Sequence, residues 1–206
     1  MTRLEKHMAS LSYKLADFQK TVLEKLDTMD KRIAKLEDSS IHKPEPFSFN
    51  TTGKFGSYYT FTNGNRTAIA TTSSPYSVFG RTPIPKDKKV KFTFLIEKET
   101  WIMVGIAPHT ALENSLAYSD KFTLACATDG NIYKNGAASG RKLQTFKAGD
   151  KITYLVDLQA AELSIELNGA FCLKETLDKS AIASHEFYPF LYTNIQTGAG
   201  ATLHDG

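Results

Sequence analysis

The sequence predicts an all-β domain, an antiparallel sandwich or barrel, that follows one long α-helix. Three observations carry this prediction. Residues 4–36 have a helical apolar stripe; after residue 47 the apolar runs are short and rich in Tyr, Phe, Val, Ile and Thr; and turn dipeptides such as Asp129-Gly130 and Asn168-Gly169 separate these runs. Many strands at regular spacing without intervening helices are typical of antiparallel β folds, not of a βαβ sheet.

The helix comes first in the chain, with a narrow apolar seam. Its residues are spaced by 4, 3, 4, 3, 4, 4, 3, 4 and 3 positions, the coiled-coil pattern with one extra four-residue step, a stutter. They are Leu4, Met8, Leu11, Leu15, Phe18, Val22, Leu26, Met29, Ile33 and Leu36. A seam exposed on a single helix would leave apolar surface in water, so we expect a homo-oligomer or pairing with another protein's helix. Packing of this helix on the chain's own β domain is the alternative.

Domain boundaries follow from composition. We assign residues 1–38 to the coiled-coil helix, 39–46 to a linker and 47–206 to the β domain. The linker is polar and contains Pro44 and Pro46, and the residue before a proline favours an extended backbone.

The β domain contains nine runs that we expect to be strands. They cover residues 57–62, 67–72, 90–97, 101–107, 122–128, 131–134, 151–158, 162–168 and 188–193. The clearest hairpin has apolar residues at every second position from Leu163 to Leu167, followed by the Asn168-Gly169 turn. Residues 110–120 have room for one short helical turn, and the Gly-rich residues 197–201 are expected to form a β-turn.

Composition and charge narrow the functional classes. The chain has 206 residues, a net charge of +3 and 23% charged residues, ordinary values for a soluble protein. We therefore expect no nucleic-acid partner, and we interpret the lysines between Lys86 and Lys91 as a solvated strand edge. No apolar run reaches the length of a membrane span, so no membrane partner is expected. The first residues lack a secretory signal pattern, which favours the cytoplasm.

Four blocks of sequence together resemble the SPRY domain. They are ETWIMVGIAP, YSDKFTLACATDGNIYKNGA, FKAGDKITYLVDLQAAELSIELNG and FYPFLY, within roughly residues 47–203. The resemblance implies two packed, bent antiparallel sheets, in a concanavalin-like sandwich, with loops that bind protein partners. It also implies that Trp101 lies in the core and that Tyr133, rather than Ile132, points inward. No PRY-type motif precedes these blocks.

A coiled coil followed by a SPRY domain also resembles the C-terminal part of TRIM-type ubiquitin ligases. The RING and B-box zinc ligands of those proteins are missing from this sequence, so ligase activity does not carry over. The sequence has two cysteines, five scattered histidines and no phosphate-binding loop, GxSxG or HExxH motif. We therefore expect no catalytic residues, metal or cofactor. A Cys126 or Cys172 nucleophile beside His185 stays open, because spacing does not show spatial adjacency.

Candidate partner-binding residues lie in or beside predicted turns. Tyr118 is an aromatic residue in a polar loop, a common place for an interface anchor. The other candidates are Arg66, Tyr76, Arg81, Lys134, Arg141, Asn194 and Gln196. For each of them, an ordinary solvated turn residue is an equally good interpretation.

The function that fits these features is a noncatalytic protein-interaction adaptor. Its coiled coil would oligomerise it, and its SPRY loops would bind a peptide or a protein surface. Two alternatives stay open: a structural subunit of a cytoskeletal or axonemal assembly, and a lectin-like glycan binder.

Overall fold

The computed structural model describes residues 14, 18–29, 31–32, 41–42, 47–98, 101–194 and 197–205. The chain divides into two compact units, Met1–Ile41 and His42–Gly206. In the first unit, the described residues 14, 18–29 and 31–32 are helical. The predicted seam residues Leu4, Met8, Leu11, Leu15, Ile33 and Leu36 lie outside the described residues. Within the described part of the chain, no helix is both long and apolar enough to cross a membrane.

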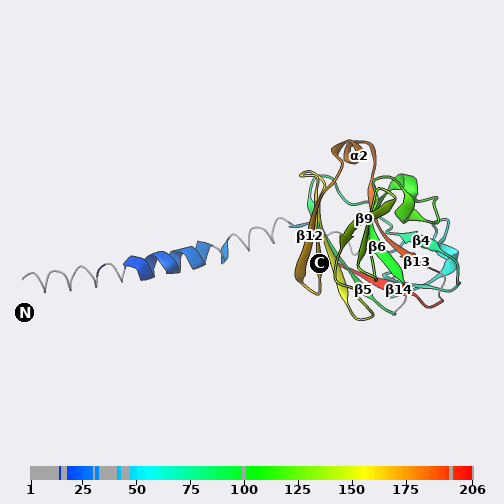
Figure 1. Cartoon of the computed structure of the whole chain (residues 1–206), viewed down its shortest axis with the longest axis horizontal. Helices are drawn as coiled ribbons and strands as arrows, with labels where there is room; N and C mark the ends of the chain where they lie inside the picture. Colours follow the sequence, from blue (N-terminus) through cyan, green and yellow to red (C-terminus); the bar gives the residue numbers. More distant parts are fainter. Residues whose placement is uncertain are drawn as a thin grey trace, which may run out of the picture. The chain divides into compact units, whose positions relative to one another are not determined.

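The second unit is a sandwich of two antiparallel sheets (Figure 1). The larger sheet follows the order β12-β11-β10-β5-β14-β3-β2, and the smaller sheet the order β4-β13-β6-β7-β8-β9. The strands are β1 (Ile41–His42), β2 (Tyr59–Thr62), β3 (Thr67–Ala70), β4 (Tyr76–Phe79), β5 (Lys89–Ile96), β6 (Ile102–Pro108), β7 (Leu124–Ala127), β8 (Asn131–Lys134), β9 (Ala137–Lys142), β10 (Lys151–Asp157), β11 (Glu162–Leu167), β12 (Ala170–Thr176), β13 (Phe187–Thr193) and β14 (Gly200–Asp205). The predicted sandwich is therefore confirmed.

Short helical segments occur only in the connections of this described domain. They are the 3₁₀ turns η1 (Gly56–Tyr58), η2 (His109–Ala111) and η3 (Ala117–Ser119), and the helix α2 (Lys179–Ser184). Asp178 caps α2, because its side chain accepts hydrogen bonds from the backbone N–H groups of Ser180 and Ala181. The turns η2 and η3 lie in the segment where the sequence predicted one short helical turn.

The main core fills the space between the two sheets. Phe92 and Tyr154 stack at a centroid distance of 5.4 Å, and Phe92 also meets the edge of Phe47 at 5.3 Å. All three are buried. The Tyr154 hydroxyl donates to the carbonyl of Val104 at 2.7 Å, so this polar group links the sheets and is not left unpaired in the core.

The turn residues behave as their sequence predicts. Asn135 and Gly136 have φ of +54° and +82°, and Asn168 and Gly169 have φ of +52° and +81°. Two successive positive φ values define the hairpin turn that Asn-Gly favours. The burial of β11 alternates along the strand with Leu163 and Ile165 inward, as the predicted hairpin requires.

Five strands lie outside the nine predicted runs: β1, β4, β9 and β14, together with β12, which is the second arm of the predicted hairpin. β14 lies inside the larger sheet, between β5 and β3. The predicted β-turn at 197–201 is thus wrong at Gly200 and Ala201, which belong to β14, whereas Gly198 has a turn conformation with φ of +86°. A side chain at Gly200 would place its Cβ 2.2 Å from the carbonyl oxygen of Ala68, so the glycine lets β14 approach β3.

Candidate partner-binding surface

The outer face of the smaller sheet carries a second apolar cluster. Small residues dominate it, and the segment 109–120 covers part of it. Its buried members are Phe79, Met103, Ala107, Ala111, Ala117, Ala125, Ala127, Phe190 and Tyr192. A sheet with apolar residues on both faces is covered by other parts of the chain or by a partner.

Segment 109–120 is fixed to the sheet by hydrogen bonds. The Ser77 hydroxyl donates to the carbonyl of Ser115 at 2.9 Å and accepts from the backbone N–H of Ala117 at 3.1 Å. The Thr123 hydroxyl donates to the carbonyl of Ala117 at 2.9 Å. Both hydroxyl groups are on buried residues, so the η3 turn that carries Tyr118 is held in one position.

Four aromatic side chains meet where η3 reaches the sheet, and we call them the aromatic surface. They are Trp101, Tyr118, Tyr133 and Tyr192. Tyr118 meets Tyr192 at 4.9 Å and Tyr133 at 5.5 Å between ring centroids, while Trp101 meets Tyr192 at 5.9 Å and Tyr133 at 6.5 Å. All four contacts are edge-to-face, the favoured geometry. Tyr192 is buried beneath the other three, which are half-buried.

The polar groups of this surface are tyrosine hydroxyls, one indole N–H and one carboxylate. Burial, followed by the interaction with Tyr118, raises the pKa of Tyr192. Burial and the nearby Asp129 carboxylate raise the pKa of Tyr133. Both phenols therefore stay protonated at neutral pH. The indole N–H of Trp101 donates to Asp129 at 3.2 Å. The surface thus offers aromatic faces beside hydrogen-bonding hydroxyl groups and one negative charge.

Two expectations about these aromatic residues are wrong. Trp101 was expected in the core, but it is half-buried at the margin of the outer cluster. Tyr133 was expected inward, but Ile132 is the residue buried between the sheets and Tyr133 lies on the outer face. Neighbouring residues of a strand point to opposite faces, and the smaller Ile132 fits among the tightly packed side chains of the main core.

Known structures resemble this domain. The SPRY domain of human HERC1 superposes with a TM-score of 0.64 at 20% sequence identity, over 77% of this chain and 98% of that one. The β-sandwich has the SPRY fold. A second human SPRY domain gives a TM-score of 0.55 at 19% identity, over 71% of this chain and 94% of its own. The TRIM65 PSpry domain gives 0.60 at 8% identity, over 84% and 99%. No family model and no curated protein sequence matches this chain.

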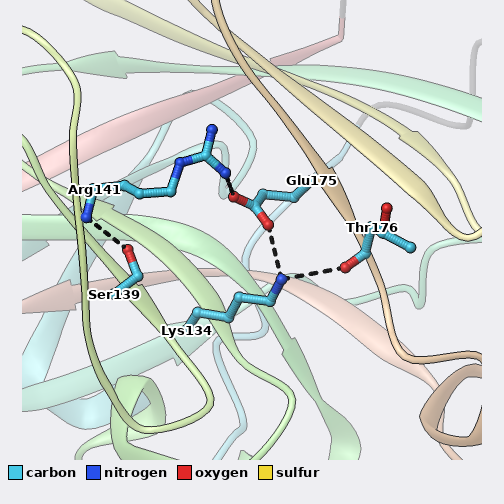
Figure 2. A network of polar contacts seen from close by, with 5 residues as sticks. All are labelled: Lys134, Ser139, Arg141, Glu175 and Thr176. Carbon is cyan, nitrogen blue, oxygen red and sulfur yellow. Dashed lines mark hydrogen bonds and ion pairs between the residues drawn. The ribbon is translucent and has the colours of Figure 1, made fainter.

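Two predicted site residues of the SPRY-fold domain pair with one buried carboxylate, that of Glu175. Lys134 Nζ lies 2.7 Å from Glu175 Oε2, and Arg141 Nη1 pairs with Glu175 Oε1, as Figure 2 shows. Lys134 also donates to the carbonyl of Thr176 at 3.3 Å. Glu175 is only 8% exposed and lies on β12, an edge of the larger sheet, whereas both cations come from the β8–β9 hairpin of the smaller sheet. The two cations are thus engaged inside the domain.

The remaining candidates do not gather around Tyr118. Arg66 pairs with Asp205 at 3.5 Å, and Arg81 is exposed. Tyr76 stacks on Tyr58 at 3.9 Å and on Phe55 at 5.2 Å, in a separate aromatic group. The remaining two are Asn194, which is half-buried, and Gln196, which lies outside the described residues.

The Cys126 thiol is buried in the core, and His185 packs beside aromatic rings. Burial raises the pKa of Cys126 to about 12, so this thiol stays protonated in the core. His185 packs against His109 at 5.2 Å and Phe122 at 5.7 Å between ring centroids. Among the described residues, no three His, Cys, Asp or Glu side chains are grouped so that they could hold a metal ion.

Proposed function

We propose that this chain is a noncatalytic interaction adaptor that binds a protein partner through the aromatic surface of its SPRY domain. The observation that carries the proposal is the set of three half-buried aromatic rings, Trp101, Tyr118 and Tyr133, on a hydrogen-bonded scaffold. Tryptophan and tyrosine are the residues most enriched among interface hot spots, and a rigid scaffold loses little entropy on binding.

The chemistry of the surface also favours a protein partner. Its rings offer apolar area, and the hydroxyl groups of the half-buried Tyr118 and Tyr133 can donate and accept hydrogen bonds at the rim. Tyr118 comes from η3 and Tyr133 from β8, and Trp101 directly precedes β6. A surface built from several segments suits a peptide or a protein face, which can contact all of them at once.

The N-terminal helix supplies the second part of the proposal. Phe18, Val22, Leu26 and Met29 follow at spacings of 4, 4 and 3 residues, and they are 65%, 38%, 50% and 56% exposed. This apolar stripe is the described part of the predicted seam, and we propose that it pairs with the same helix of a second copy. Oligomerisation would let several weak SPRY sites bind together with higher avidity.

Truncation of Tyr118 tests the role of the aromatic surface. The full chain and its Tyr118→Ala variant are used to capture proteins from a native cell extract. We expect Tyr118→Ala to lose the captured partner, since Tyr118 supplies the aromatic ring that η3 contributes to this surface. The matched control is Phe171→Ala, which removes an aromatic side chain that is 67% exposed on β12. Thermal unfolding curves first establish that both proteins are folded. Equal capture by Tyr118→Ala and the unchanged chain would then contradict the proposal.

A further inference from the structure

A cleft of about 820 Å³ opens beside the β11–β12 hairpin of the SPRY domain. Its apolar wall includes Trp101, Phe146 and Leu167, and its charged groups are Asp129, Asp150 and Lys147. This volume lies in the range of small-ligand sites and suits one long side chain with the backbone around it. Trp101 and the Asp129 carboxylate next to it connect the cleft to the aromatic surface.

The Asp129 carboxylate is fixed by neutral donors. Its Oδ1 accepts from the backbone N–H of Asn131 at 3.0 Å, and its Oδ2 accepts from the Asn131 side-chain amide at 2.9 Å and the Trp101 indole at 3.2 Å. Burial alone would raise the pKa of Asp129, but these hydrogen bonds and the charge of Lys142 together lower it. The group is therefore an ionised and immobile carboxylate at neutral pH.

Asp150 is held in the same way. Its Oδ1 accepts from the Asn168 side-chain amide at 2.8 Å and its Oδ2 from the backbone N–H of Lys147 at 2.7 Å. These two hydrogen bonds are the main cause of its lowered pKa. Asn168 is itself fixed, because its Oδ1 accepts from the backbone N–H of Lys151 at 2.8 Å. The cleft thus has two preorganised carboxylates, supplied by different segments of the chain.

Neither carboxylate is neutralised by a direct ion pair. Among the described residues, no Lys, Arg or His nitrogen lies within 4.0 Å of Asp129 or Asp150. Lys142 and Lys147 act on them only at longer range, and both side chains are exposed. A carboxylate has about four lone-pair directions. The donors described above use three of these directions on Asp129 and two on Asp150. Both carboxylates can therefore still accept hydrogen bonds from a cationic ligand.

We propose that this cleft binds an arginine side chain of a partner protein. A planar guanidinium stacks on aromatic rings and donates up to five hydrogen bonds in fixed directions, which fits a cleft lined by a tryptophan and two fixed carboxylates. A lysine ammonium would match the charge but not the planar stacking. The cleft shares Trp101 and Asp129 with the aromatic surface of the proposed function, whereas Lys147 and Asp150 belong to the cleft alone.

Trp101 is the only tryptophan of the chain, so its indole N–H gives a single NMR signal inside the cleft. The full chain is titrated with Nα-acetyl-arginine-N-methylamide and, separately, with the citrulline derivative, which has the same shape without the charge. We expect a saturable shift of the Trp101 signal with the arginine derivative and a much weaker response to citrulline. Equal responses, or no saturable shift with arginine, would overturn the proposal. A response to putrescine as strong as that to arginine would also overturn it, because the ligand would then be a free amine.

Variants of opposite sign sharpen the test. Asp150→Asn should weaken arginine binding about two- to five-fold, and Lys147→Ala should strengthen it by a similar factor. The control is Asp87→Asn, which removes an equal charge from an exposed loop outside the cleft. A loss with Asp87→Asn equal to that with Asp150→Asn would show a general charge effect and refute the site. If Asp150→Asn does not fold, unchanged binding by Lys147→Ala refutes it instead.

Discussion

Glu175 shows how a single residue joins the edges of the two sheets. The residue is 8% exposed, and its cationic partners Lys134 and Arg141 reach its carboxylate from the opposite sheet. A buried charge is costly unless it is paired and hydrogen-bonded. Removing the Glu175 carboxylate would therefore leave two cations without their counter-charge. Lys134 and Arg141 were considered as partner contacts because they stand beside turns. Their pairing with Glu175 gives them a structural role that spacing along the chain cannot show.

The substitution Glu175→Gln should therefore lower the free energy of unfolding by about 1–3 kcal/mol, because it keeps the side-chain volume but removes the charge that both cations face. The measurement is urea-induced unfolding of the full chain. Glu162→Gln is the matched control on the same hairpin. Its ion pair with Lys174 at 2.8 Å is solvent-exposed, so its loss should cost no more than about 0.5 kcal/mol. Equal effects of the two substitutions would show that Glu175 contributes no more than a surface charge.

At the level of elements, sequence patterns predicted the strands that have alternating apolar residues next to a turn dipeptide. The β10–β11–β12 meander has alternating apolar residues and an Asn-Gly turn, so its register is readable from neighbouring residues. β14 differs, because its residues 200–205 contain two glycine or alanine positions and a histidine. It is a strand because it pairs with β5 and β3, which are more than 100 residues earlier in the chain. Strand pairing between such distant segments cannot be predicted from the periodicity of the sequence.

The aromatic surface was only partly predictable for the same reason. Tyr118 was recognised because an aromatic residue in a polar loop is a local signal. Trp101, Tyr133 and Tyr192 come from three different strand regions, and only the order of strands in the smaller sheet brings them to Tyr118. For Tyr133, the alternation of a four-residue strand allowed either face, and the packing of Ile132 in the main core decided it.

The position of β14 leads to a prediction about Gly200. In Gly200→Ala, the new Cβ would lie 2.2 Å from the carbonyl oxygen of Ala68 and 2.5 Å from Ile69 Cδ1. Backbone of β3 must move to relieve the first contact, so we expect a loss of about 2–4 kcal/mol in urea unfolding. Gly53→Ala is the control, because its nearest contact would be 3.6 Å away. If both variants are equally stable, the close approach of β14 to β3 is not required by the fold.

On the scale of the whole molecule, the chain combines a helical unit with a SPRY-fold domain, and the proposed adaptor needs both. In proteins, most of the stability of a helix comes from packing of its apolar face rather than from its backbone alone. The exposed stripe of Phe18, Val22, Leu26 and Met29 on this helix is an unfavourable apolar surface. Pairing of helices from two or more copies would bury the stripe and stabilise the helix.

Two leucines of this helix provide a direct test of self-association. Leu26 lies on the seam and is 50% exposed, whereas Leu23 lies off the seam and is 66% exposed. A lysine in the seam would place a charge in the apolar interface, so Leu26→Lys should shift the molar mass measured by light scattering from a multiple of 22.8 kDa to that of the monomer. Leu23→Lys adds the same charge outside the seam and should leave the oligomer intact. A monomeric unsubstituted chain, or loss of the oligomer with both variants alike, would show that the predicted seam is not the contact between copies.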